Sequence, residues 1–425
     1  MPITHKMSVL VVCICHLGIA RAEDAECQAK EAQAAQQSAV AMTASQPAQL
    51  SFALAPAKLE GTVRTGTQAN LVFGGYAETF YQWNFNEPSN GITNFRGYDN
   101  RHNSFTISNA VLDVVGTAGP ASAHVAVQFG HTPETYYLAE PSLLGAGGAA
   151  STSASVWKFL QQANAGYRVP LGRGLLMEGG LFLSPIGPEG LAIKDQWNWS
   201  RSNLFFGLPA YHTALRLSYP LSDRLTFMVM GCNGWNSVVD NNAEKSIAIS
   251  ASYSITDKLT SQILYFTGVE RPTGAPEGSP WRHLFDAYAT WYPLFWLALN
   301  VHGDAGFEPN NFGTSYWAAI ALSARVQPLP WLYFAWRGDV FYEGVAKNAQ
   351  GQASAIFWPS PWVTSQTLTA DVRPYDNVSF RLEYRHDQAG ALMFFRGVVA
   401  TDMTGAFVMN ARSQDTMAAG MAVWF

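Results

Sequence analysis

The sequence predicts an all-β fold, a transmembrane antiparallel β-barrel of about 16 strands with short periplasmic turns and long extracellular loops. Three observations predict it. Apolar and polar residues alternate with period two in many segments, and short and long links alternate along the chain. No run of about 18 apolar residues follows the first twenty or so positions, so strands rather than helices are the expected membrane-crossing elements.

The composition limits the classes of protein that fit. The chain has 425 residues, of which 13% are charged and 13% aromatic, and its formal net charge is -5. A chain this long and this apolar is not intrinsically disordered, and its charge gives no reason to expect nucleic acid as a partner. There is no Cys/His metal pattern, no P-loop and no dinucleotide fingerprint, so we expect neither a metal ion nor another cofactor.

The N-terminus has the features of a secretory signal peptide. Lys6 precedes an apolar stretch over 7–20, and the triplet Ala-Arg-Ala at 20–22 fits the small-x-small cleavage pattern. We therefore expect residues 1–22 to direct export and the mature chain to start near Glu23.

Residues 23–68 differ in composition from the rest of the chain. The stretch over 23–49 is rich in Ala, Gln and Glu, and 50–68 has the composition of a connector. A short periplasmic coiled coil that helps the protein oligomerise and a flexible tether are both compatible with it, and the thin apolar seam favours the tether. After cleavage only Cys27 and Cys232 remain, which excludes a disulfide framework.

From residue 69 onward, every second residue of each segment is apolar and the residues between them are more polar. In one of the clearest segments, Val378, Phe380, Leu382 and Tyr384 alternate with Ser379, Arg381, Glu383 and Arg385. The segment over 414–425 alternates in the same way, and we expect it to close the barrel against 73–85, with Phe425 on the side of the short turns. The segment over 105–115 switches parity near Asn109, which predicts a β-bulge.

The links between the segments have two lengths. Short turn-like links lie at 116–120, 169–173, 219–224, 255–258, 292–295, 327–330 and 373–377, and longer ones lie near 86–102, 132–156, 184–208, 235–244, 268–281, 305–313, 344–361 and 388–413. This alternation is typical of outer-membrane barrels. Aromatic residues beside the short links predict an interfacial girdle, formed by Tyr219, Tyr292, Trp296, Trp331, Tyr333, Tyr375, Trp424 and Phe425.

Several stretches resemble a known family. FGGYAETFYQWNFN over 73–86, followed by RGYDNRHNSF over 96–105, is similar to the start of the putative beta-barrel porins of the OmpL-like family. GLFLSPIGPE over 180–189, WSRS over 199–202 and LPAYH over 208–212 look like the middle segment of that family. The resemblance covers most of residues 70–425. It implies an outer-membrane channel for small hydrophilic solutes or ions, with lipid and solute as partners, and it permits a homotrimer.

If the wetter face of the barrel lines a lumen, its charged residues are the candidate pore-lining groups. They are Glu78, His124, Glu178, Arg216, Asp286, Arg337, Asp339, Arg381, Glu383 and Arg385. Both signs of charge are present in nearly equal number, so they can set a transverse field across a constriction but predict only weak ion selectivity. The alternative is that these charges pair across neighbouring strands simply to satisfy one another.

The long link over 184–208 is the candidate constriction loop, because general porins fold the corresponding loop into the barrel. Its prolines stiffen it, and its charged and aromatic groups are placed to meet a permeating solute. The candidates are Glu189, Lys194, Asp195, Trp197, Trp199 and Arg201. The two tryptophans either offer flat faces to sugars or anchor the loop to the wall, and we favour anchoring.

Two other classes of protein stay open at this point. An outer-membrane barrel enzyme is one, although the histidines are scattered over different segments and no motif places a nucleophile beside any of them. We therefore predict no catalytic residue, and a barrel of about 16 strands is wide enough for an aqueous channel. A secreted carbohydrate-binding or adhesion protein is the other alternative, suggested by the aromatic residues in the loops.

Overall fold

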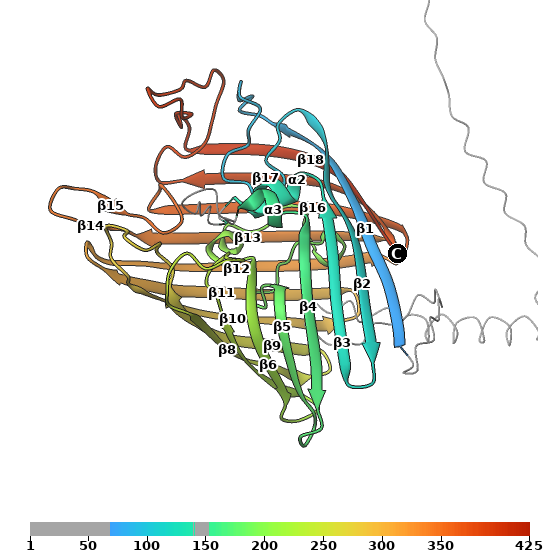
Figure 1. Cartoon of the computed structure of the whole chain (residues 1–425). Helices are drawn as coiled ribbons and strands as arrows, with labels where there is room; N and C mark the ends of the chain where they lie inside the picture. The colour runs from blue at the N-terminus through green and yellow to red at the C-terminus, as the bar shows by residue number, and fades with distance from the viewer. Residues whose placement is uncertain (1–68, 139, 141–152) are drawn as a thin grey trace, which may run out of the picture. The chain divides into compact units, whose positions relative to one another are not determined.

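The computed structural model describes residues 69–138, 140 and 153–425; the expected signal peptide and the segment over 23–68 lie outside this part of the chain. The strands are β1 (Ala69–Asn84), β2 (Ser104–Ala118), β3 (Ala121–Phe129), β4 (Leu160–Val169), β5 (Leu175–Leu183), β6 (Tyr211–Pro220), β7 (Leu225–Cys232), β8 (Ser246–Thr256), β9 (Leu259–Val269), β10 (Trp281–Leu294), β11 (Leu297–Asn310), β12 (Gly313–Leu329), β13 (Leu332–Gly344), β14 (Ala346–Lys347), β15 (Ala353–Ser354), β16 (Trp362–Tyr375), β17 (Val378–Ala389) and β18 (Ser413–Trp424). Within these residues, sixteen strands, all except the short β14–β15 hairpin, form one closed barrel (Figure 1). The predicted fold class is confirmed.

Among the described residues, the few helices lie in the links between strands. They are α2 (His131–Tyr136), α3 (Ala154–Trp157), η2 (Ile193–Asp195) and η3 (Leu204–Gly207). In the part of the chain that the structure describes, no helix has the length and apolar character needed to cross a membrane.

Alternation along the strands sorts side chains to the two faces of the barrel wall. On β17, the apolar Phe380, Leu382 and Tyr384 are exposed on the outer surface, while Arg381 and Glu383 are buried inside. Successive side chains of a strand point to opposite faces, so the parity of the sequence decides which residues face the interior. An apolar outer surface around a closed barrel is stable in hydrocarbon, because every backbone polar group is paired within the wall.

The positions of the links define two ends of the barrel. All seven predicted short links are confirmed, and we call their side the turn end and the opposite side the loop end. The expected long link at 305–313 is wrong, because β11 continues to Asn310 and β12 begins at Gly313. Glu308, within this stretch, points into the barrel, where its carboxylate pairs with Arg282 at 2.7 Å. This ion pair holds the stretch against the barrel wall as part of β11.

The predicted bulge on the second strand is present. Along the pair β1–β2, Glu78 lies opposite Asn109 and the next residue, Thr79, lies opposite Ile107. Ser108 is therefore an extra residue in β2. Ser108 and Asn109 are both buried, which explains the change of parity in the sequence.

The barrel closes between its first and last strands, as predicted. In Figure 1 the blue β1 runs beside the red β18, and the register places Tyr76 opposite Trp424. Phe425 extends this pairing, because its backbone N–H donates to the Gly75 carbonyl at 3.1 Å and its carbonyl accepts from the Gly75 N–H at 3.2 Å.

The aromatic residues near the turn end do not all form an outer girdle. Trp296, Trp331 and Tyr375 are exposed, as a girdle requires. Tyr333 and Trp424 instead lie 5.2 and 5.8 Å from the guanidinium of Arg373, on the inward parity of their strands. For these two residues the girdle prediction is wrong, because their place in the alternation sends them into the interior.

The interior near the loop end is filled with apolar side chains. Trp317 on β12 and Phe341 on β13 are fully buried. Phe357, from the link between β15 and β16, packs its ring edge-on against both, with centroids 5.1 and 5.6 Å apart. Phe206 and Trp235, from two other links, pack on the same cluster. Several long links therefore fold into the barrel rather than extending away from it.

Candidate functional site

The link over 184–210, between β5 and β6, crosses the barrel interior to the opposite wall; we call it the inner loop. At η2, the Ile193 N–H donates to Glu78 on β1 at 2.6 Å. Further along, the Asn198 side chain donates to Thr369 on β16 at 2.7 Å. In the closed barrel β16 lies on the opposite side of the ring from β5 and β6, and β1 lies between them, four strands from β5. The inner loop therefore spans the lumen.

Glu383 on β17 holds the middle of the inner loop. Its carboxylate accepts the backbone N–H of Trp199 at 2.5 Å and that of Ser200 at 2.9 Å. The Thr369 hydroxyl donates to the same carboxylate at 2.8 Å. Hydrogen bonds to an ionised acceptor are stronger than neutral ones, and this carboxylate is buried, so it is a strong attachment point.

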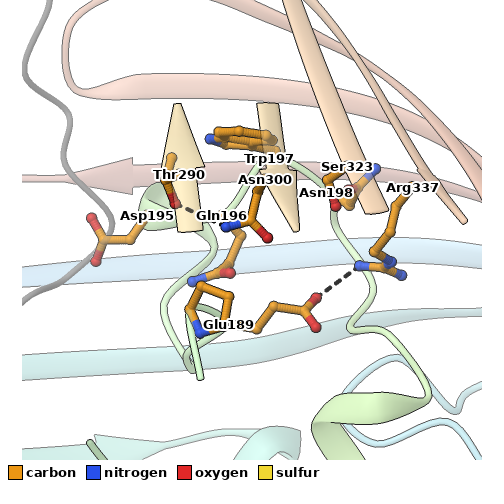
Figure 2. A pocket seen from close by; sticks show the side chains of 10 residues that line it. Glu189, Asp195, Gln196, Trp197, Asn198, Thr290, Asn300, Ser323 and Arg337 are labelled. Carbon is orange, nitrogen blue, oxygen red and sulfur yellow. Dashed lines mark hydrogen bonds and ion pairs between the residues drawn. The ribbon is translucent and has the colours of Figure 1, made fainter. Parts of the chain in front are cut away.

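Arg337 on β13 makes a second attachment. Its guanidinium forms an ion pair with Glu189 at 2.9 Å (Figure 2) and donates to the Ser200 carbonyl at 2.6 Å. Burial alone raises the pKa of Glu189, but the charge of Arg337 and hydrogen bonds from Ser202 outweigh it, so this pKa lies below its usual value. Glu189 is therefore ionised at neutral pH and attracts Arg337.

Three more of the predicted wall residues contact the inner loop. Asp339 accepts from the Asn203 amide at 2.9 Å, and Arg385 donates to the Asn203 side-chain oxygen at 3.1 Å. Arg381 donates to the Asn198 carbonyl at 3.0 Å. With Glu78, Glu383 and Arg337, six of the ten candidate pore-lining residues thus hold the inner loop in place.

The other four candidate wall residues pair on the wall itself. Glu178 and Arg216 form an ion pair at 2.8 Å between β5 and β6. His124 lies 2.8 Å from Asp113, and the Asp286 carboxylate lies 2.6 Å from a ring nitrogen of His302. Apart from His124, the candidates are at most 4% exposed, nine of the ten in all. Their contact with a permeating solute stays a prediction, because the contacts seen here serve the loop or a neighbouring strand.

Trp199 and Arg201 are structural parts of the inner loop. Trp199 is buried with its ring 5.9 Å from that of Phe80, an anchoring position. The Arg201 guanidinium donates to the carbonyls of Gly190 at 2.7 Å and Trp199 at 2.6 Å. Arg201 therefore braces the fold of the loop and is itself buried, and its contact with a solute stays a prediction.

A small polar pocket separates the inner loop from the wall formed by β10, β11 and β12. It measures about 50 Å³, enough for a few water molecules. Its loop side includes Glu189, Asp195 and Trp197, and its wall side includes Thr290, Asn300 and Ser323 (Figure 2). The inner loop is thus bound to one side of the barrel and leaves a polar gap on the other side.

Lys194 and Asp195 keep partial exposure beside this pocket. They pair with each other at 2.9 Å, with about a third of each side chain accessible. Trp197 is half-buried, and the guanidinium of Arg325 on β12 lies 5.2 Å from its ring. With Glu189, which lines the pocket, these three are the constriction-loop candidates that remain within reach of a solute. In the described ranges, no three His, Cys, Asp or Glu side chains are placed to share a metal ion.

The whole barrel matches one protein family. The profile of the family described as "Putative beta-barrel porin-2, OmpL-like" covers residues 70–425, far more than half of the chain. The chain belongs to this family. It is an outer-membrane porin, as the resemblance of its first strands implied. No curated protein matches the sequence.

Solved structures show the same kind of barrel at low sequence identity. The outer membrane channel DcaP of Acinetobacter baumannii has a TM-score of 0.52 and 9% identity, over 86% of this chain and 100% of that one. OmpT of Vibrio cholerae, in a trimer form, has a TM-score of 0.52 and 9% identity over 84% and 99%. An anion-selective porin from Comamonas acidovorans has a TM-score of 0.52 and 11% identity over 84% and 100%. At identities this low, the structural similarity shows a shared fold for this porin.

Some residues that hold the inner loop of this porin were not predicted from the sequence. Thr369 and Asn203 are uncharged and gave no signal of their own. Gly420 on β18 makes room for the inner loop, because a side chain there would overlap the Trp199 ring. The inward position of this glycine is visible in the alternation, but its partner becomes known only once the path of the loop is known.

Proposed function

We propose that this porin forms a water-filled channel for passive diffusion of small hydrophilic solutes or ions, with the inner loop as its constriction. The observation that carries the proposal is the double attachment of the loop, by Glu383 to its middle and by Arg337 to Glu189. Charged groups and backbone amides hold the loop inside the barrel and leave a polar gap on the side of β10 to β12. A polar gap beside a fixed loop limits the size of a permeating solute.

Deleting residues 190–200 tests this proposal. We expect a higher single-channel conductance in a planar bilayer, because the deletion removes the segment that crosses the lumen. The matched control deletes 398–408, an equally long piece of the largely exposed link between β17 and β18, and leaves the conductance unchanged. An unchanged conductance in the 190–200 deletion, with the barrel folded, would remove the inner loop from the pore.

Export and assembly complete the proposal. Residues 1–22 act as a signal peptide, 23–68 lie in the periplasm as a linker, and 69–425 form the membrane domain, with lipid around its apolar outer surface. We propose a homotrimer, in line with the trimer form recorded for OmpT of Vibrio cholerae. Chemical cross-linking of the protein in outer-membrane fractions tests the assembly, and a single monomer band would contradict it.

An enzyme inside the barrel is the rival function, and one contact bears on it. Ser184 lies 3.2 Å from one ring nitrogen of His212, a pairing that nucleophilic catalysis uses. The other ring nitrogen lies 3.0 Å from the Gly234 carbonyl instead of a carboxylate. A carboxylate partner orients the histidine of a catalytic triad and stabilises its charged form, and this position holds a neutral group. We therefore propose a channel rather than an enzyme.

A further inference from the structure

We propose that this porin holds a binding subsite for small organic carboxylates, formed by Arg325 of β12 together with the rings of Trp197 and Tyr333. The subsite lies between the inner loop and the turn end of the lumen. The inference rests on the proposed channel function and adds a class of solute to it.

The first argument is the unused hydrogen-bonding capacity of Arg325. Its guanidinium lies 5.2 Å from the ring centroid of Trp197 and 5.2 Å from that of Tyr333. Among residues 69–138, 140 and 153–425 it has neither a hydrogen bond nor an ion pair, and its side chain is only partly buried. Arginine stays charged in proteins and presents five N–H donors in a planar fork that matches a carboxylate. These donors are available to a solute.

The second argument is the local excess of positive charge. Arg373 lies over the same Tyr333 ring, also at 5.2 Å, so it is a neighbour of Arg325. The nearby carboxylate of Asp371 is shared, because it pairs with Arg373 at 2.9 Å and with Arg381 at 3.2 Å. Both pairs of Asp371 are thus made with other guanidinium groups, and Arg325 has no ion pair with it. An anion that enters this region is attracted, and Arg325 is the group left to bind it.

The third argument is the position of the subsite on the route through the barrel. Ser323 and Arg325 have the same parity on β12, and Ser323 lines the polar pocket beside the inner loop. Trp197 belongs to both places, since it lines that pocket (Figure 2) and its ring lies against the guanidinium of Arg325. A solute that crosses the gap therefore reaches Arg325 next.

The two rings refine the class of anion. Aromatic faces contribute favourable contact with flat apolar groups, while the guanidinium binds the carboxylate. A carboxylate that is attached to a flat apolar group can contact the rings and the guanidinium together, whereas an inorganic anion interacts only with the charge. Benzoate is therefore the probe for this subsite.

The test measures benzoate block of the full-length porin in planar bilayers. We expect benzoate to lower the single-channel current, and Arg325→Gln to weaken the apparent affinity for benzoate about tenfold, because the charged hydrogen bonds are lost. Arg325→Lys keeps the charge without the fork and should fall between the two. The matched control is Arg173→Gln, in an exposed turn at the same end of the barrel, and it should leave the block unchanged.

The outcomes separate the subsite from the channel. An open wild-type channel that benzoate does not affect, or an equal block in Arg325→Gln, would overturn the subsite and leave the channel function standing. A wild-type protein that does not conduct would overturn the channel function. In that case calorimetric titration of the folded, detergent-solubilised protein with benzoate decides the subsite: binding by the wild type that Arg325→Gln loses supports it, and no binding or equal binding overturns it. Heat-modifiable migration confirms that each variant is folded.

Discussion

The indole ring of Trp199 fills the space beside Gly420 on β18 that a side chain at this position would need. Trp199 is buried there, and Glu383 accepts the N–H group of the same residue. The inner loop is therefore held here by two features of neighbouring strands. Gly420 on β18 leaves room for the Trp199 ring, and Glu383 on β17 accepts the backbone N–H.

Replacing Gly420 with alanine should release the inner loop. The new Cβ would overlap the Trp199 ring, so the ring moves away and single-channel conductance rises. Gly231→Ala on β7 is the control, because a Cβ at that position meets nothing within 4 Å. Trp199→Ala should raise conductance too, and combining it with Gly420→Ala should add little, since both act on one contact. Wild-type conductance in Gly420→Ala would show that this contact does not hold the loop.

Replacing Glu383 with glutamine should loosen the middle of the inner loop. An uncharged amide accepts the two backbone N–H groups less strongly, which we expect to weaken docking by about 2 kcal/mol. Lys194 in the loop then becomes easier for trypsin to reach, so cleavage of the folded protein speeds up. Asp223→Asn, which removes the charge of an exposed ion pair with Arg173, serves as the control. Equal cleavage rates for wild type and Glu383→Gln would contradict this role.

Conductance should rise in acid through Glu189. Burial raises the pKa of this carboxyl, but Arg337 and the hydrogen bonds from Ser202 lower it further, so the folded value lies below 4.5. A lowered carboxyl pKa stabilises loop docking above pH 4.5, and this stabilisation is lost as the pH falls through the folded pKa. Conductance measured across this range should therefore increase on acidification. Glu189→Gln should show the higher conductance at neutral pH, and a pH response identical to that of the wild type would rule out Glu189 as its source.

Replacing Phe425 with alanine should impair assembly rather than conduction. Its ring lies so close to Gly75 that a Cβ there would approach it within 2.9 Å, and its backbone closes the pair with β1. We expect a smaller heat-modifiable fraction in outer membranes and a normal conductance for the barrels that do assemble. Phe295→Ala, in a turn at the same end, is the control. Normal assembly of Phe425→Ala would show that the ring is dispensable.

Much of the wall was predictable because strand faces follow local alternation. The parity on β17 assigned Arg381 and Glu383 to the interior, and the change of parity at Asn109 located the bulge. The prediction failed at 305–313, where Pro and Gly suggested a loop. There the pairing of β11 with β12 and the ion pair of Glu308 continue the strands, and both depend on partners in other parts of the barrel.

By itself the sequence determined the barrel, the alternation of short and long links and the charged interior, because periodicity and composition are local properties. Only the tertiary structure decided how those charges are used. Glu383 and Trp199 meet across 184 positions of sequence. Within the part of the chain that the structure describes, Arg325 has no ion pair, and the nearby carboxylate of Asp371 pairs with Arg373 and Arg381. Such contacts depend on the path of the inner loop through the lumen, and no local pattern in the chain encodes that path.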